Sequence, residues 1–293
     1  MTDQSSHRKI AFQGEPGAYS DLACRSRFPD LTPLPCASFE DVFAAVESEA
    51  AQTAMIPIEN SVAGRVADIH HLIPQSSLHI IAEHFQPVHH QLLAVKGATL
   101  EGLKTVHSHV HALSQCRDMI REQGLTPIVH ADTAGSARET AERGDPSQAA
   151  IASSLAAEIY DLQVLASDIE DANHNTTRFA IMAQQPQRPA LDAGMVMTSL
   201  IFQVRNVPAA LYKAMGGFAT NSVNMVKLES YQLGGSFSAT QFYADIEGHP
   251  DHKPVRLALE ELDFFTSEVR ILGVYPADPF RQQNGTLTGD QGA

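Results

Sequence analysis

Positive charge is scarce in this sequence. Its 293 residues include 20 lysines and arginines against 34 aspartates and glutamates, so the formal net charge is −14. A field of this sign repels phosphate backbones and anionic headgroups, which argues against nucleic acid and membrane surfaces as partners. A small anion can still bind where an arginine or a helix N-terminus supplies local positive potential. Any anion site in this protein therefore needs its own cation.

Cysteines and long apolar runs are also scarce. Cys24, Cys36 and Cys116 lie far apart and include no Cys-x-x-Cys pair, so their spacing predicts neither a disulfide framework nor a thiolate zinc site. No run reaches the roughly 18 apolar residues of a membrane span, and the polar N-terminal arm lacks the apolar segment of a signal peptide. We expect a cytoplasmic protein.

Signatures of cofactor binding and of serine hydrolysis are missing. Residues 14–17 (GEPG) have neither the Gly-x-Gly-x-x-Gly spacing nor the Lys-Ser/Thr of a phosphate loop, and no Gly-x-Ser-x-Gly elbow occurs. His107, His109 and His111 would share one face of a strand. Ser108, however, reads as a strand-to-helix junction, and no carboxylate or thiolate stands at ligand spacing. We expect no metal and no cofactor.

The chain is long enough for two or three domains, and its 43% apolar and 18% charged residues are typical of a globular protein. Strands alternate with helices over residues 9–183, with two β-rich runs flanking Pro87. This order is typical of parallel sheets, whose ligands bind at the carboxyl ends of strands. Strands are expected at 9–13, 53–58, 104–107, 127–130, 149–152 and 179–183, and helices at 18–28, 39–47, 110–123 and 133–143.

The composition changes after residue 183. Residues 184–195 are polar, contain proline and lack periodicity, which predicts a linker. A second unit follows over residues 196–276 in the order βαββαβ, the ferredoxin-like arrangement. Its strands are expected at 199–204, 224–232, 238–246 and 268–274, and its helices at 207–219 and 254–264. We expect residues 1–8 and 277–293 to be disordered.

Polar groups gather where the expected strands of the first unit end. Taken alone, residues 173–179 (NHNTTRF) also fit a solvated turn that caps a strand. A guanidinium contact, at about 1.5–3 kcal/mol, should outweigh a helix N-terminus, at about 0.3–1 kcal/mol, in binding a carboxylate. The residues alone therefore predict an α/β protein that binds a small carboxylate. The candidates are Asn60, Ser61, Ser108, Thr176 and Thr177, with Arg178 and Arg65 as cations.

Five motifs, in order along nearly the whole chain, resemble those of the prephenate dehydratases. The resemblance implies a cofactor-free carbon–oxygen lyase of phenylalanine biosynthesis, which converts prephenate to phenylpyruvate with loss of carbon dioxide and of the ring hydroxyl as water. The motifs are AFQGEPGAYS at 11–20, IPIENS at 56–61 with Gly64, Ser108-His109 with Gln115-Cys116, NTTRF at 175–179, and the C-terminal βαββαβ unit, which looks like an ACT regulatory domain.

The resemblance also assigns roles to residues. It implies that Thr177 donates a hydrogen bond or a proton to the leaving hydroxyl, and we expect Arg178 to bind a substrate carboxylate. Asn60, Ser108 and Gln115 would orient the substrate, and Thr176, Ser61 and Gly64 would contact it. The implied catalytic domain, residues 9–183, has two periplasmic-binding-protein-like lobes around a cleft, 9–86 with 170–183 and 87–169. The crossings near Pro87 and Asp168 would form the hinge.

The ACT-like unit implies L-phenylalanine as an effector and a homodimer or homotetramer. Its phenylalanine site would include Val207, Ala209, Ala210, Leu211, Glu229 and Ser230. The family glycine of Gly-Ala-Leu-Val is replaced, and a methyl group at Ala209 would crowd a ligand lying against the backbone. The Glu-Ser-Arg-Pro motif is reduced to residues 229–232 (ESYQ).

Two alternatives to a prephenate dehydratase stay open. They are an arogenate dehydratase on the same scaffold and a non-catalytic sensor of aromatic acids. Val110 and His111 replace the usual proline and glutamine of the third motif, and they leave substrate choice open.

Overall fold

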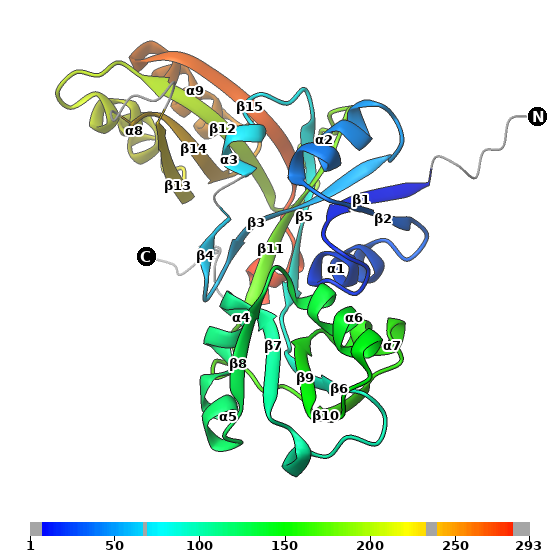
Figure 1. Cartoon of the computed structure of the whole chain (residues 1–293). Coiled ribbons are helices and arrows are strands. Elements are labelled where there is room, and N and C mark those ends of the chain that lie inside the picture. Colours follow the sequence, from blue (N-terminus) through cyan, green and yellow to red (C-terminus); the bar gives the residue numbers. More distant parts are fainter. Residues whose placement is uncertain (1–7, 67–68, 233–238, 284–293) are drawn as a thin grey trace, which may run out of the picture. The chain divides into compact units, whose positions relative to one another are not determined.

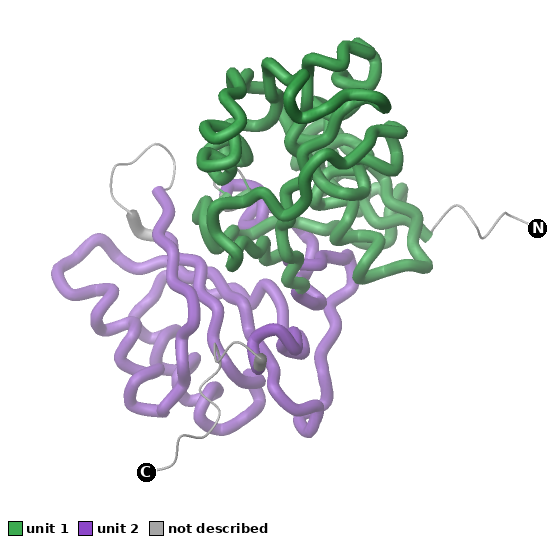
Figure 2. The backbone as a smooth tube through the Cα atoms, turned by 90° about the horizontal axis from the view of Figure 1, so that it is seen from below, with its two compact units in different colours: residues 1–69, 84–179 green, residues 70–83, 180–293 purple. Residues whose placement is uncertain are grey.

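The computed structural model describes residues 8–66, 69–232 and 239–283. The chain forms two compact units (Figure 2). Unit 1 comprises Met1–Ile69 and His84–Phe179, and unit 2 comprises His70–Glu83 and Ala180–Ala293. No helix in the described part of the chain is long and apolar enough to cross a bilayer. The arm expected over residues 1–8 lies almost wholly outside the described residues.

The first sheet has the strand order β2-β1-β3-β11-β5, with β4 paired to β3 (Figure 1). Strand β1 pairs in parallel with both β2 and β3, as the alternation of strands and helices predicts. The capping box of Ser38 and Asp41 begins α2. The elements are β1 (Lys9–Gln13), α1 (Tyr19–Arg27), β2 (Thr32–Cys36), α2 (Phe39–Glu47), β3 (Thr53–Asn60), β4 (Gly64–Arg65), α3 (Ile69–Leu72), β5 (His79–Pro87) and β11 (Thr176–Ala183).

The second sheet of unit 1 has the order β10-β6-β9-β7-β8. Alternate residues of its strands enter two cores: Ile151 packs with α4 and α5, whereas Ala150 and Ala152 pack with α6 and α7. Both faces of the sheet are therefore covered. The elements are β6 (Gln91–Ala94), η2 (Leu100–Gly102), β7 (Thr105–His109), α4 (Val110–Gln115), α5 (Arg117–Glu122), β8 (Thr126–His130), α6 (Thr133–Arg143), β9 (Gln148–Ala152), α7 (Ser154–Ile159) and β10 (Gln163–Ala166).

Unit 2 contains the βαββαβ order expected from the sequence. Its sheet has the order β13-β14-β12-β15, and each neighbouring pair is antiparallel. The stacked rings of Phe202 and Phe242 lie in its core with Phe218 and Leu262. The elements are β12 (Val196–Val204), α8 (Ala210–Thr220), β13 (Met225–Gln232), β14 (Ala239–Glu247), α9 (Lys253–Phe265), β15 (Thr266–Pro276) and α10 (Pro279–Gln283).

The segments around β3 and β7 differ from the sequence predictions. Strand β3 continues to Asn60, beyond the expected end at residue 58, and the chain then turns back at once into β4, which the sequence did not predict. Ser108 lies inside β7 rather than at its end, and the helix expected over residues 110–123 breaks at Cys116 into α4 and α5.

The C-terminal segment also differs from expectation. Residues 279–283 form α10, so the expectation of a disordered tail from residue 277 was wrong for this segment. Arg281 is buried and binds the Glu83 carboxylate through two hydrogen bonds of 2.6 and 2.8 Å. Residues 284–293 lie outside the described part.

Candidate active site

Thr177, near the start of β11, accepts a hydrogen bond from Asn60 at the end of β3. The Asn60 Nδ2–H group donates to Thr177 Oγ1 at 3.0 Å and to Asn175 Oδ1 at 2.8 Å. Asn60 Oδ1 accepts from the backbone N–H groups of Val62 at 2.9 Å and Ala63 at 2.7 Å. A backbone N–H group can only donate, so the Asn60 amide has one orientation. The Thr177 hydroxyl accepts from Asn60 and keeps its own proton to donate elsewhere.

Hydrogen bonds join the turn after β3 to the segment that leads into β11. The backbone N–H of Ser61 donates to Thr176 O, and the Ser61 hydroxyl accepts from the Thr176 N–H; both distances are 2.9 Å. The same hydroxyl donates to His174 O at 2.6 Å. Gly64 has φ of +84°, a conformation that favours glycine, where the chain returns into β4. Ser61, Thr176 and Gly64 thus hold the turn that positions Asn60.

The hydrogen bonds continue from Asn175 to the second sheet of unit 1. Asn175 Nδ2 donates to Gln115 Oε1 at 3.0 Å, and His90 Nε2 lies 2.8 Å from the same oxygen. Tyr19 Oη lies 2.8 Å from His90 Nδ1. His90 and Asn175 are buried. We call the linked side chains the polar network: Tyr19, His90, Gln115, Asn175, Asn60 and Thr177.

Burial sets the protonation of two members of the polar network. Desolvation is the largest cause that lowers the pKa of His90, and it also raises the pKa of Tyr19 well above its usual value. Both groups are therefore neutral at neutral pH. The sequence motifs include Tyr19 but assign it no role, and nothing in the local sequence distinguishes His90 from the adjacent His89.

A cavity of about 390 Å³ opens beside the polar network. Gln115 lines it, and because Gln115 Oε1 accepts two hydrogen bonds, its Nε2–H₂ group is the donor left for a ligand. Arg117 is exposed here and supplies a guanidinium that the sequence analysis did not single out. The remaining lining residues are Val62, Ala63, His111, Ser114, Glu170, Asp171, Ala172 and Asn175.

Arg178, the expected carboxylate ligand, is only 4% exposed. Its guanidinium forms an ion pair with Glu59 at 3.2 Å, which links β11 to the neighbouring β3. Arg178 lines neither the 390 Å³ cavity nor the larger one described next, and the same holds for Asn60 and Thr177, which reach the 390 Å³ cavity only through Asn175 and Gln115. Its role as a substrate ligand stays a prediction.

Ser108 is fully buried, and its hydroxyl donates to Ile151 O at 2.6 Å. It therefore joins β7 to β9. Its proposed contact with the substrate also stays a prediction.

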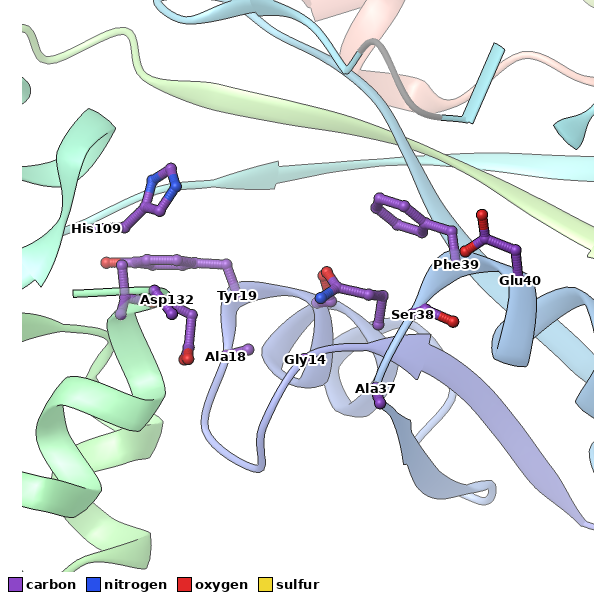
Figure 3. A pocket seen from close by; sticks show the side chains of 13 residues that line it. Gly14, Ala18, Tyr19, Ala37, Ser38, Phe39, Glu40, His109 and Asp132 are labelled. Carbon is purple, nitrogen blue, oxygen red and sulfur yellow. The ribbon is translucent and has the colours of Figure 1, made fainter. Parts of the chain in front are cut away.

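A second cavity, of about 550 Å³, is lined by residues of the first motif (Figure 3). Phe39 and Glu40 lie at one end of it, and His109 and Asp132 lie at the other. The ring of Tyr19 lines this cavity while its hydroxyl belongs to the polar network. The other lining residues are Gln13, Gly14, Ala18, Ser20, Ala37, Ser38, Ala131 and Thr133.

The histidines do not group as their spacing suggested. His107 and His109 both lie on β7, but the described residues place a possible metal-ligand group elsewhere, at His89, Asp168 and Glu170. In that group His89 Nδ1 lies 2.9 Å from Glu170 Oε1, and Glu170 Oε2 accepts from the backbone N–H of His90. These contacts bind together the two segments that cross between the sheets of unit 1.

The expected phenylalanine-site residues lie on two elements of unit 2. Val207, Ala209, Ala210 and Leu211 precede or begin α8, and Glu229 and Ser230 lie on the edge strand β13. Ala209 has φ of +61°, so an alanine occupies the left-handed conformation where the family has glycine. The Glu229 carboxylate pairs with Lys227 at 2.8 Å.

Comparison with known proteins gives one family. Residues 10–187 match the family model described as prephenate dehydratase. The chain is 52% identical over 276 residues to a bifunctional N-acyl-homoserine lactone acylase/prephenate dehydratase of Komagataeibacter europaeus, which covers 94% of this chain and 98% of the relative. It is 39% identical over 287 residues to the chloroplastic arogenate dehydratase/prephenate dehydratase 1 of Arabidopsis thaliana. That match covers 93% of this chain and 73% of the relative.

A solved structure agrees with these relatives. The crystal structure of prephenate dehydratase in complex with L-Phe from Arthrobacter aurescens superposes with a TM-score of 0.84 at 30% identity. The match covers 92% of this chain and 89% of that one.

Proposed function

The chain belongs to the prephenate dehydratase family, and we propose that it converts prephenate to phenylpyruvate, water and carbon dioxide without a cofactor. The direction of the hydrogen bond from Asn60 to Thr177 carries this proposal. It leaves the Thr177 O–H group as the donor for the ring hydroxyl of the substrate. A sensor that only binds an aromatic acid has no need of a donor aimed at a leaving group.

Thr177 assists departure of the ring hydroxyl by hydrogen bonding. As the carbon–oxygen bond breaks, negative charge grows on that oxygen, and a placed donor stabilises it, contributing about 10²–10⁴-fold in rate. Threonine is a weak acid, so solvent ultimately supplies the proton that turns hydroxide into water. The electron pair of the bond to the ring carboxylate completes the aromatic ring as carbon dioxide leaves.

One substrate carboxylate needs a firm contact and the other must stay free to leave. We propose that Arg117 and the Gln115 Nε2–H₂ group bind the side-chain carboxylate, because both line the 390 Å³ cavity beside the polar network. The ring carboxylate should make weaker contacts, because tight binding would stabilise the ground state and slow decarboxylation. Arg178 holds β3 against β11 through Glu59 and supports the position of Thr177.

Arogenate is the second candidate substrate. It carries an ammonium group in place of the keto group, and Glu170 and Asp171 line the same cavity. The Glu170 carboxylate already contacts the His89 ring and accepts from the His90 backbone N–H, and Asp171 accepts from the backbone N–H groups of Arg117 and Asp118. These donors offset the negative charge, which favours prephenate. His111, which departs from the family pattern, lines this cavity and is our candidate for substrate choice.

Acyl-homoserine lactone hydrolysis is a further candidate because of the 52% identity to the Komagataeibacter relative. Amide hydrolysis by a serine needs a base beside the hydroxyl. The Ser108 hydroxyl instead donates to Ile151 O, and the Ser153 hydroxyl donates to Gly17 O at 2.5 Å. Neither serine is activated in this arrangement, so we rank dehydration first.

We further propose that unit 2 contains an ACT domain that binds L-phenylalanine between subunits of a homodimer or homotetramer. The βαββαβ order and the L-Phe complex of the Arthrobacter relative support this. Tyr212 and Phe264 are 81% and 78% exposed on α8 and α9, which supplies apolar surface for a second subunit. The phenylalanine-binding residues would be those expected from the sequence. We also propose that the catalytic domain has two lobes joined by a hinge, and that the protein is cytoplasmic.

The test compares three substrates under one condition. Purified protein treated with a chelator is assayed with prephenate, arogenate and an acyl-homoserine lactone, with and without L-phenylalanine. We expect the highest kcat/KM for prephenate and inhibition by phenylalanine. A larger kcat/KM for arogenate would reassign the substrate, and release of homoserine lactone without phenylpyruvate would refute the dehydratase proposal.

A further inference from the structure

The backbone sets the direction of the polar network at one end. Because Val62 and Ala63 donate to Asn60 Oδ1, Asn60 presents its N–H group to Asn175 Oδ1. Asn175 therefore turns its Nδ2–H₂ group toward Gln115 and donates to Oε1 at 3.0 Å. Each side-chain amide has one oxygen that accepts and one nitrogen that donates. Rotating any one of these amides by 180° would therefore place two donors or two acceptors opposite each other.

This direction fixes the tautomer of His90 at the other end. Gln115 Oε1 is an acceptor, and it lies 2.8 Å from His90 Nε2, so that nitrogen carries the proton. In a neutral imidazole Nδ1 is then an acceptor, and the Tyr19 hydroxyl, 2.8 Å away, is its donor. The His89 carbonyl oxygen, 3.0 Å from the same hydroxyl, is a second acceptor for that proton. Because burial keeps Tyr19 protonated and lowers the pKa of His90, this pairing persists at neutral pH.

We propose that Tyr19 and His90 are positioning residues of the candidate active site. They hold the neutral Nε2–H tautomer of His90, which keeps Gln115 and Asn175 oriented so that Gln115 Nε2–H₂ faces the 390 Å³ cavity. The catalytic part of this inference rests on the dehydratase function proposed above.

The opposite tautomer breaks the network at Gln115, although at the other end Tyr19 could then accept from His90 Nδ1 and donate to the His89 carbonyl oxygen. With the proton on Nδ1, the Nε2 lone pair of His90 would oppose Gln115 Oε1. Gln115 would relieve this by turning over, but its N–H₂ group would then face the Asn175 N–H₂ group. Asn175 cannot turn in response, because Asn60 is fixed by two backbone donors. The network would lose a buried hydrogen bond, and Gln115 would no longer offer a donor to the cavity.

His90 is held at both its ring and its backbone. The rings of Tyr19 and His90 meet edge to face with centroids 5.4 Å apart, and the His90 N–H donates to Glu170 Oε2 at 2.8 Å. The adjacent His89 is exposed, and its ring contacts Glu170 instead of the network. His89 therefore offers a matched control of the same residue type.

The tautomer is measured directly, without reference to activity. In the full-length protein labelled with ¹⁵N-histidine, the His90 signal is assigned as the one that disappears in His90→Gln. We expect, at neutral pH, a protonated Nε2 and an unprotonated Nδ1. A protonated Nδ1 would overturn the inference, and this holds whether or not the protein is a dehydratase.

Kinetics test the consequence for catalysis. We expect His90→Leu to lower kcat for prephenate by about 10- to 100-fold, because a small misplacement of a catalytic group has effects of this size. His90→Gln keeps an N–H donor near the Nε2 position and should recover most of the loss. His89→Gln changes a contact of Glu170 but not the network, so it should lower kcat far less than His90→Leu. Equal impairment in His90→Leu and His90→Gln, or none in either, contradicts the positioning role. Absence of turnover in the wild type would refute the dehydratase function. The NMR measurement of the His90 tautomer would still test the hydrogen-bond arrangement of the network.

Discussion

The side-chain amide of Asn60 donates to the hydroxyl oxygen of Thr177 at 3.0 Å and cannot reverse that bond. The two residues lie on neighbouring strands, although they are 117 residues apart in the sequence. Their hydrogen bond leaves the proton of the Thr177 hydroxyl free for another acceptor, which in the proposed reaction is the leaving oxygen of the substrate.

Asn60→Asp should reverse this hydrogen bond. One carboxylate oxygen still accepts from Val62 and Ala63, but the other becomes an acceptor for the Thr177 hydroxyl. The hydroxyl proton then points at residue 60 and away from the substrate, so kcat should fall by about 10²-fold or more. Steady-state kinetics measure the effect, and the thermal midpoint checks the fold. A variant with wild-type kcat contradicts the donor geometry.

Arg117 and Arg178 should fail in different ways. Arg117→Gln removes an exposed cation from the cavity, so KM should rise by about 10- to 100-fold, the equivalent of about 1.5–3 kcal/mol, with little change in stability. Arg178→Gln breaks the pair with Glu59 and should lower the free energy of unfolding by about 1–3 kcal/mol. Urea titration and initial rates distinguish the two. If only Arg178→Gln raised KM, the carboxylate ligand would be Arg178.

His90 should make stability depend on pH. Its pKa in the folded protein lies below the ordinary value of 6.5 because burial disfavours the imidazolium. Between these two values the unfolded chain binds more protons, so the free energy of unfolding falls as the pH drops below about 6.5. His107 and His109, with lowered pKa values of the same cause, contribute in the same direction. In urea titrations on the acid side, His90→Gln should lose less stability than the wild type. An equal loss would remove His90 from this effect.

Ala209→Gly should stabilise unit 2. Alanine at φ of +61° carries a steric strain of about 1 kcal/mol that glycine avoids. The larger entropy of glycine in the unfolded chain offsets part of this gain. The thermal midpoint should rise, and calorimetry should show tighter binding of phenylalanine because the methyl group is gone. Ala210→Gly, at the first position of α8, is the matched control and should not raise the midpoint, because Ala210 is not among the residues of positive φ. A lower midpoint for Ala209→Gly would contradict the strain.

Local sequence patterns predicted most of the elements but not all of them. Helices α2 and α6 carry their N-caps, Ser38 and Asp132, in the sequence, and β1 is a short apolar run, so each was predicted closely. Strand β2 was missed because Pro33 and Pro35 argue against a strand. Both are tolerated because β2 lies at the edge of its sheet, where donors on one side need no partner.

The site required contacts that no local pattern contains. Thr177, Asn60 and Gln115 were identified by motif, and the structure joins them through Asn175. Arg178 can be buried because its charge is paired with Glu59, a residue 119 positions away in the sequence. Arg117 was missed because the helix expected over residues 110–123 placed no break before it. Only the fold shows that α5 begins there, beside Gln115.

The comparison of Thr177→Val with Thr177→Ser tests the central claim most directly. Valine keeps the shape of threonine without the hydroxyl, whereas serine keeps the hydroxyl. With prephenate as substrate, we expect kcat to fall by at least about 10²-fold in Thr177→Val and to be largely kept in Thr177→Ser, with unchanged thermal midpoints. Wild-type turnover by Thr177→Val would show that no hydroxyl at this position acts in the reaction.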